Sequence, residues 1–326
     1  MMRFLLGLVL AFTFSFPSLA AVSLQEEHYQ LKSGEGHDEI QQAKSAVLIG
    51  DYATALRILE PLAESGDPVA QLNLGVMYRR GHGLEQDEAR GLQLYKLSAE
   101  QGFAGAQHNL GAVLLNSATT LAERSAAVEL FKLAAEQGNE PSAQVLDELF
   151  KIGLEAAKSG NYEEALKNWA PLAESGSAQA QMNLGTMYSK GDGVKKDQKL
   201  AFSFYLKAAE QGIMKGQFLV GQMYQDGEGT DKKPVEALKW FLRAAKQGDS
   251  NSQVMLSAAL ALGEVVQRDA LGSLFWAYAA EIEGNEDAAP IVQMLEKAIS
   301  KKTDPSKLLQ MKELVRECVK KNYEGC

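Results

Sequence analysis

The chain has 326 residues, of which 46% are hydrophobic and 23% are charged, and its formal net charge at pH 7 is -9. A chain of this length and apolarity can bury a sizeable core, which excludes a fully disordered protein. Nucleic acid and anionic membrane surfaces are excluded as partners, because binding them needs clustered Lys and Arg that this acidic sequence does not show.

The first 20 residues have the pattern of a secretory signal peptide. Arg3 precedes an apolar run from Phe4 to Phe16, and Pro17 and a small-residue sequence ending in Ala20 follow. The run is shorter than the ~20 apolar residues of a membrane-spanning helix. The sequence therefore predicts cleavage of residues 1–20 and a mature chain that is periplasmic or secreted, without stable membrane insertion.

A repeat of 36 residues occupies most of the remaining chain. Residues 70–78 read Ala-Gln-Leu-Asn-Leu-Gly-Val-Met-Tyr, and related sequences begin at residues 106, 180 and 216. The units close with Ala-Glu-Gln-Gly at 99–102, 135–138 and 209–212, and with Ala-Lys-Gln-Gly at 245–248. Such a fixed period is the signature of a protein built from stacked structural units.

A larger duplication underlies this repeat. Gly50-Asp51-Tyr52 returns 110 residues later as Gly160-Asn161-Tyr162, and the sequence at 61–66 returns at 171–176. The last unit of each block, 103–138 and 249–284, lacks the Met-Tyr and Gly-x-Gly elements. We therefore expect a flexible polar segment at 21–40, repeat blocks at 41–150 and 151–284, and C-terminal capping helices at 285–326.

The periodicity within each unit predicts two helices and no strand. Small or apolar residues in the second half recur at positions i, i+1, i+4, i+7 and i+8, as in the series that starts at Ala201, which is one face of an α-helix. Asp87 and Asp197 stand where an N-cap is needed, and Gly75 in the first helix would let a neighbouring helix approach closely. One hairpin cannot bury its apolar side alone, so the hairpins must stack into an all-α solenoid.

The recurring string Ala-Gln-x-Asn-Leu-Gly-x-Met-Tyr, then Gly-x-Gly, an Asp and a closing Ala-Ala-Glu-Gln-Gly, resembles the Sel1-like repeat, a relative of the tetratricopeptide repeat. The resemblance covers about 41–284. It implies a right-handed α-solenoid that binds other proteins as an adaptor in signalling, in the cell envelope or in contact with host cells. One branch of the family has disulfides within its units, and this chain has no Cys there.

Positions that differ between the units on one side of the first helices are candidates for binding a partner protein. With a spacing of i, i+3, i+7 and i+10 they share one face, which in related solenoids is concave. We expect Leu72, Met182 and Phe218 to be exposed anchors, so Phe218→Glu should weaken binding without unfolding the chain, whereas Gly185→Val or Tyr188→Ala should damage the fold. The predicted protein-binding residues are Leu72, Val76, Arg79, His108, Met182, Thr186, Phe218 and Gln222.

No residue group predicts catalysis, a cofactor or a metal. The Gly-x-Gly sequences at 81–83, 191–193 and 227–229 could suggest phosphate-binding loops, but they lie between helices and repeat, which favours structural turns. The four histidines include no pair at metal-ligand spacing. The prediction is a protein without enzymatic activity or cofactor.

Cys318 and Cys326 are the only cysteines. In an oxidising compartment they should form a disulfide, which would stabilise the chain by roughly 2.5 kcal/mol for a loop of about nine residues. Three function classes remain from the sequence: an envelope adaptor that binds other proteins, a secreted factor that engages another cell, and an envelope hydrolase or its regulator.

Overall fold

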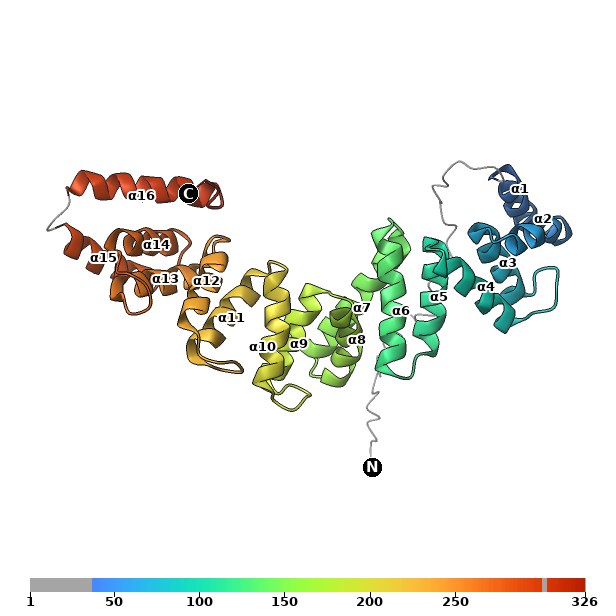
Figure 1. Cartoon of the computed structure of the whole chain (residues 1–326), viewed down its shortest axis with the longest axis horizontal. Coiled ribbons are helices and arrows are strands. Elements are labelled where there is room, and N and C mark those ends of the chain that lie inside the picture. The colour runs from blue at the N-terminus through green and yellow to red at the C-terminus, as the bar shows by residue number, and fades with distance from the viewer. Residues whose placement is uncertain (1–36, 301–303, 326) are drawn as a thin grey trace, which may run out of the picture. The chain divides into compact units, whose positions relative to one another are not determined.

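The computed structural model describes residues 37–300 and 304–325. The predicted signal peptide and most of the segment 21–40 lie outside the described residues. The chain divides into two compact units, Met1–Val145 and Leu146–Cys326. Each unit is an array of helices joined by short loops (Figure 1).

The first unit consists of helical hairpins in which each helix packs on the next one along the chain. It contains α1 (His37–Leu48), α2 (Tyr52–Glu64), α3 (Pro68–Arg80), α4 (Glu88–Glu100), α5 (Ala104–Ser117), α6 (Leu121–Glu136) and the first residues of α7 (Glu140–Lys158).

The second unit repeats this arrangement and ends in two further helices. It contains the remainder of α7, α8 (Tyr162–Glu174), α9 (Ala178–Lys190), α10 (Gln198–Glu210), α11 (Met214–Asp226), α12 (Pro234–Ala245), α13 (Ser250–Leu262), α14 (Ala270–Ile282), α15 (Ala288–Ile299) and α16 (Pro305–Lys320). No strand occurs in residues 37–300 or 304–325. The predicted all-α fold of stacked helical hairpins is confirmed.

One predicted boundary is wrong. The segment 21–40 was expected to lack regular structure, but its last four residues, from His37, form the first turn of α1. Ile40 is buried, and Ala43 and Ala46 follow it at helical spacing and pack against α2. The acidic side chains Asp38 and Glu39 lie in the first turn, where they interact favourably with the helix dipole.

Close contact between the two helices of a unit depends on the glycine in the first helix. A Cβ atom at Gly75 would lie 2.8 Å from Tyr95 Cδ1, and one at Gly185 would lie 2.6 Å from Tyr205 Cδ1. Real Cβ atoms do not approach other atoms this closely, so any side chain at these positions would force the aromatic ring away. The predicted role of Gly75 is confirmed.

Buried glutamines connect successive 36-residue repeats. In the second unit Gln181 Nε2 donates to Ala173 O at 3.0 Å in the preceding helix, and Gln211 Nε2 donates to Gln181 Oε1 at 2.8 Å. Gln217 and Gln247 repeat this pair at 2.8 Å. In the first unit Gln101 donates in the same way to Gln71, and Gln137 donates to Gln107. We call this series the glutamine ladder; it satisfies the polar atoms that stacking would otherwise bury without partners.

The ladder changes at the last hairpin. The residue one period after Gln247 is Glu283, whose carboxylate cannot donate, and Gln253 Oε1 is buried without a hydrogen-bond partner. Gln253 Nε2 keeps the usual bond to the preceding helix, at 3.1 Å to Ala245 O, and also donates to Tyr323 Oη at 2.6 Å. Burial and the neighbouring Glu283 carboxylate raise the pKa of Tyr323 to about 12, so its hydroxyl stays protonated. The C-terminal tail is therefore hydrogen-bonded to the last hairpin at the point where the ladder changes.

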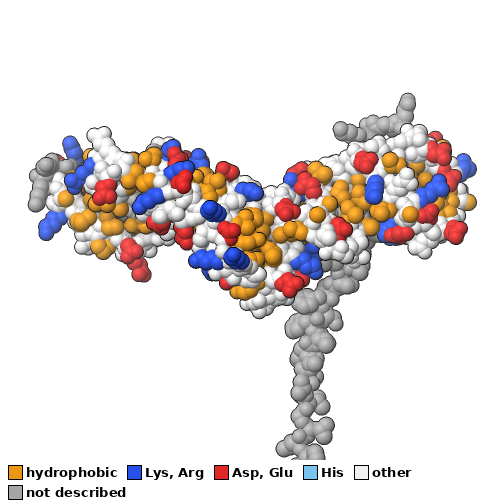
Figure 2. All heavy atoms as spheres, turned by 60° about the horizontal axis from the view of Figure 1, so that its bottom comes forward, with side chains coloured by type: hydrophobic (Ala, Val, Ile, Leu, Met, Phe, Trp, Pro, Cys, Tyr) orange, Lys and Arg blue, Asp and Glu red, His pale blue; other side chains and the backbone are white. Residues whose placement is uncertain are grey.

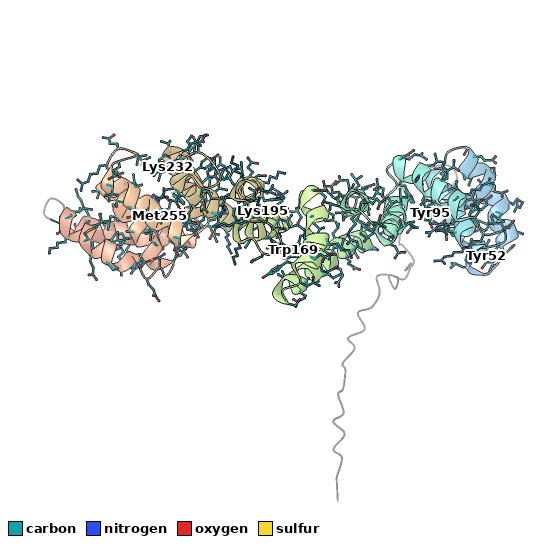
Figure 3. All side chains as sticks on the ribbon, turned by 90° about the horizontal axis from the view of Figure 1, so that it is seen from below. Tyr52, Tyr95, Trp169, Lys195, Lys232 and Met255 are labelled. Atoms are coloured by element: carbon teal, nitrogen blue, oxygen red, sulfur yellow. The ribbon has the colours of Figure 1, made fainter. Side chains whose placement is uncertain are left out.

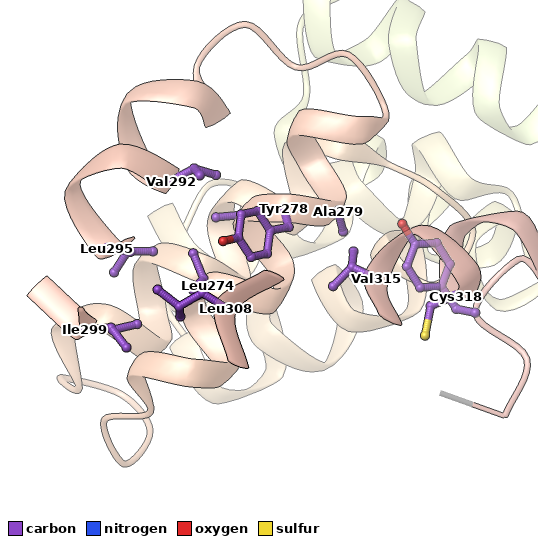
Figure 4. Close-up of a cluster of buried hydrophobic side chains, with 11 residues drawn as sticks. Leu274, Tyr278, Ala279, Val292, Leu295, Ile299, Leu308, Val315 and Cys318 are labelled. Carbon is purple, nitrogen blue, oxygen red and sulfur yellow. The ribbon is translucent and has the colours of Figure 1, made fainter. Parts of the chain in front are cut away.

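A hydrophobic cluster holds the C-terminal helices on the last hairpin. Leu274 and Tyr278 of α14 pack with Val292 and Leu295 of α15 and with side chains of α16 (Figure 4). Cys318 is 1% exposed in this cluster and is disulfide-bonded. Its predicted partner, Cys326, lies outside the described residues.

Candidate protein-binding surface

Two of the three apolar anchors predicted for partner binding are buried. Leu72 is 5% exposed and packs against Tyr95, Ala99 and side chains of α5, and Met182 is 8% exposed in the corresponding cluster of α10 and α11. The expectation that both are exposed is wrong. A first helix contacts its own second helix and also both neighbouring units, so more than one of its faces is buried.

Phe218 is half-buried and packs on the cluster of Ala237, Phe241, Ala245 and Leu256. Its ring centroid lies 6.0 Å from that of Phe241. The expectation that Phe218→Glu leaves the fold intact is therefore wrong, because a carboxylate here would be placed against apolar side chains. That substitution cannot separate binding from stability.

His108 is 5% exposed and belongs to the core of the first unit. Its Nδ1 lies 2.8 Å from Ser142 Oγ of α7, and its ring meets the edge of Phe131 with 5.5 Å between centroids. Burial lowers the pKa of His108, which keeps the ring neutral. The expected exposed, polar contact at His108 is wrong; the residue joins α5 to α7.

The remaining predicted residues lie at the surface without being fully exposed. Val76, Thr186 and Gln222 are half-buried and occupy equivalent positions in α3, α9 and α11. Thr186 Oγ1 donates to Met182 O at 3.1 Å and accepts from Tyr205 Oη at 3.3 Å.

These three residues define the accessible face of the first helices. Residues three before and four after them are also half-buried or exposed, so the spacing i, i+3, i+7 marks a continuous row of side chains on each helix. We call this row the first-helix stripe: Asn73, Val76 and Arg80 on α3, Asn183, Thr186 and Lys190 on α9, and Leu219, Gln222 and Asp226 on α11. Its last position changes from Arg or Lys to Asp between repeats. On the face of the molecule that Figure 2 draws, Lys and Arg side chains are interspersed with Asp and Glu.

Arg79 does not extend into solvent. Its Nε donates to Glu88 Oε1 at 2.9 Å, and its guanidinium lies over the Tyr95 ring, 5.4 Å from the centroid. Gly91 makes room for it, since a Cβ atom there would collide with Arg79 Cγ. Arg79 therefore covers the aromatic ring of its own unit.

The second unit has a cavity at the corresponding place, which the sequence did not predict. Its volume is about 240 Å³, and it is lined by Ser189, Gln198, Tyr205, Leu219, Gln222, Met223, Asp226 and Glu228. Of the eight predicted binding residues, Gln222 alone lines it, while Thr186 is hydrogen-bonded to Tyr205, which lines it.

The Gly-x-Gly sequences are structural turns. The first glycine of each has a left-handed conformation that ends the first helix, with φ of 68° at Gly81 and 84° at Gly191. The second glycine packs against another helix, because a Cβ atom would collide with Tyr52 of α2 at Gly83, with Tyr162 of α8 at Gly193 and with Gln198 O of α10 at Gly229. The first two contacts account for the tyrosine that both block openings share, and the close packing leaves no cradle for a phosphate.

Among the described residues, no group of three or more His, Cys, Asp and Glu side chains could hold a metal ion. No helix in this part of the chain combines the length and apolarity needed to cross a bilayer.

The fold and the ladder define a helical-hairpin repeat protein whose paired helices are packed through glycine contacts and linked by glutamine hydrogen bonds. The family model described as Sel1 repeat matches residues 68–103, 104–139, 178–213 and 215–249. The chain belongs to the Sel1 repeat proteins, as its recurring string predicted.

Two curated relatives, both described as an exopolysaccharide production negative regulator, match part of the chain. The protein of Rhizobium leguminosarum bv. viciae is 41% identical over 58 residues, 18% of this chain and 22% of the relative. That of Rhizobium meliloti (strain 1021) is 38% identical over 71 residues, 20% of this chain and 26% of the relative. The match thus spans about a quarter of each relative's length.

Solved Sel1 repeat structures also resemble the chain. A protective antigen present in uropathogenic Escherichia coli strains, displaying an SLR fold, is 29% identical with a TM-score of 0.45. The match covers 89% of this chain and 62% of that chain. A Sel1 repeat protein from Oxalobacter formigenes is 28% identical with a TM-score of 0.38, and the match covers 74% of this chain and 96% of that chain.

Proposed function

We propose that this protein is an exported adaptor that binds other proteins through the first-helix stripe and has no catalytic activity of its own. The observation that carries the proposal is the contrast within the repeats. Positions that pack the two helices of a repeat together, such as Gly75 and Gly185, are glycine in all four matched repeats, whereas the stripe presents Val76, Thr186 and Gln222 at one accessible position. Variation at an accessible position is consistent with a surface that is adapted to a partner.

Export is supported by the charge and apolar pattern of residues 1–20, and a location in the cell envelope is the simplest destination for such a chain. The disulfide bond of Cys318 agrees with folding in an oxidising compartment.

Site-specific photo-crosslinking tests the adaptor role. A benzoylphenylalanine is placed at Thr186 or Gln222 on the stripe, and at exposed Lys207 or Lys239 on second helices as controls. We expect one discrete cross-linked product in the source cells from the stripe positions and none from the controls. Equal products from both sets would contradict a specific surface, and absence of any product would contradict the adaptor role.

A regulatory role in exopolysaccharide production is a second candidate, favoured by the name that both curated relatives carry. It is compatible with an adaptor, since a regulator can act by holding a signalling protein. Deletion of the gene should raise exopolysaccharide yield, and re-expression of the unchanged protein should restore it. An unchanged yield after deletion would remove this candidate and leave the adaptor proposal intact.

A further inference from the structure

We infer that the cavity over Tyr205 in the second unit binds an arginine side chain of the partner protein. The inference rests on the proposed protein-binding function, and it assigns a chemistry to one place on that surface. Its basis is a comparison between the two blocks of the same chain, in which equivalent residues are 110 positions apart.

In the first block this place is filled from within. The Arg79 guanidinium lies over the Tyr95 ring and is paired with Glu88. The contact combines a cation–π interaction with a charge-assisted hydrogen bond, the arrangement for which a planar guanidinium is well suited.

In the second block the ring is kept, but the internal arginine and its paired glutamate are missing. Tyr205 replaces Tyr95, Gln198 replaces Glu88, and Ser189 replaces Arg79. The cavity is lined by these three residues of the second block. Because Ser189 is too short to reach over the ring, the space that the Arg79 guanidinium fills in the first block is open in the second.

The polar groups of the cavity fit a cation that donates hydrogen bonds. Gln198 Nε2 donates to Ser189 O at 3.2 Å, while Gln198 Oε1 is buried with no donor. Asp226 and Glu228 line the cavity from the next unit, and no basic side chain lines it. Lys195 and Lys232 lie in the neighbouring loops, labelled in Figure 3, and are not among the lining residues. A guanidinium would supply donors to Gln198 Oε1 and charge opposite to the two carboxylates.

The volume also favours one side chain over a larger ligand. About 240 Å³ is below the ~300–1,000 Å³ that is typical of small-molecule sites. The cavity adjoins Gln222 and Asp226 of the first-helix stripe, so a protein segment lying along α11 could place an arginine in it.

The test measures the binding of three matched probes to the purified protein by saturation-transfer NMR. The probes are N-acetyl-arginine amide, N-acetyl-lysine amide and N-acetyl-citrulline amide. We expect saturable binding of the arginine probe and binding weaker by about tenfold for neutral citrulline, which keeps the shape but loses the charge. Equal binding of arginine and citrulline, or of arginine and lysine, would overturn the assignment to a guanidinium.

Two variants locate the binding. The triple variant Ser189→Arg, Gln198→Glu, Ala201→Gly rebuilds the first block's arrangement, with Ala201→Gly making the room that Gly91 provides. It should lose the arginine probe while its melting temperature stays the same or rises. In case it fails to fold, the exposed pair Asp226→Asn, Glu228→Gln should weaken arginine binding at an unchanged melting temperature.

Undiminished arginine binding by either folded variant would show that the cavity is not the site. If the triple variant loses the arginine probe but still cross-links to its partner at Thr186, the adaptor role stands and the arginine-dependent mode of binding does not. If cross-linking at the stripe is absent in the unchanged protein as well, the proposed function itself has failed.

Discussion

Substitution of Gly185 by alanine measures how tightly the two helices of a unit are packed. The new Cβ atom would lie 2.6 Å from Tyr205 Cδ1 and 2.7 Å from Cε1. The ring is 4% exposed and has little room to move, so the strain should reach about 2–3 kcal/mol, the upper part of the usual range for overpacking. Alanine also favours the helical state over glycine by about 1 kcal/mol. The net loss of unfolding free energy should be about 1–2 kcal/mol.

Urea denaturation of the full chain, followed by circular dichroism, gives the change in unfolding free energy. Gly111→Ala is the graded control, because its Cβ atom would lie 3.2 Å from Ala127 O and 3.3 Å from the Phe131 ring, and we expect little net change. Adding Tyr205→Leu to the Gly185→Ala variant should restore part of the lost unfolding free energy, because the smaller side chain relieves the contact. The two substitutions together should then cost less than the sum of their separate effects. A Gly185→Ala variant as stable as the parent would refute the argument that ring contact, and not helix propensity, selects glycine here.

Three further outcomes are expected. Glu283→Gln should raise the unfolding free energy by about 1 kcal/mol in urea titrations, because its amide can donate to the unpaired Gln253 Oε1 as in the other units. Burial lowers the pKa of His108 below its ordinary 6.5, so below that pH the unfolded chain binds more protons at His108 than the folded chain does. The stability that the neutral ring contributes is fully present above pH 6.5 and is lost as the pH falls. His108→Asn should therefore flatten the acid side of a profile of melting temperature against pH, and no such change is expected if the ring is protonated in the fold. Reducing the disulfide of Cys318 should lower the melting temperature, whereas an unchanged value would argue against its stabilising role.

The secondary structure could be predicted in detail because each unit carries local signals. Asp87 and Asp197 are N-caps whose side chains accept from Arg90 N and Leu200 N, and Pro234 begins α12. These features depend on residues within one turn of each other, and several copies of each were available for comparison within the same chain.

The buried faces of the first helices could not be predicted equally well. Ala70 and Leu74 face α2, while Leu72 on another side of the same helix faces α4 and α5. Variation among Leu72, His108 and Met182 was interpreted as freedom from stacking, but each copy is matched to different neighbours. For His108 that neighbour is Ser142, and nothing local to either residue indicates the pairing. The replacement of Arg79 by Ser189 between otherwise similar blocks was a visible signal for the cavity, and it becomes meaningful once the guanidinium is seen over Tyr95.

The glutamine ladder has a direction. Each acceptor, Gln71, Gln107, Gln181 or Gln217, receives its hydrogen bond from a residue 30 positions further along the chain, in the closing turn of its own unit. Insertion or deletion of a whole 36-residue period therefore keeps every donor with its acceptor, whereas a cut inside a period separates them. Such a protein can change its length during evolution by copying or losing complete units. The tail around Tyr323 packs on the last hairpin, so a change in the number of preceding repeats leaves its contacts in place.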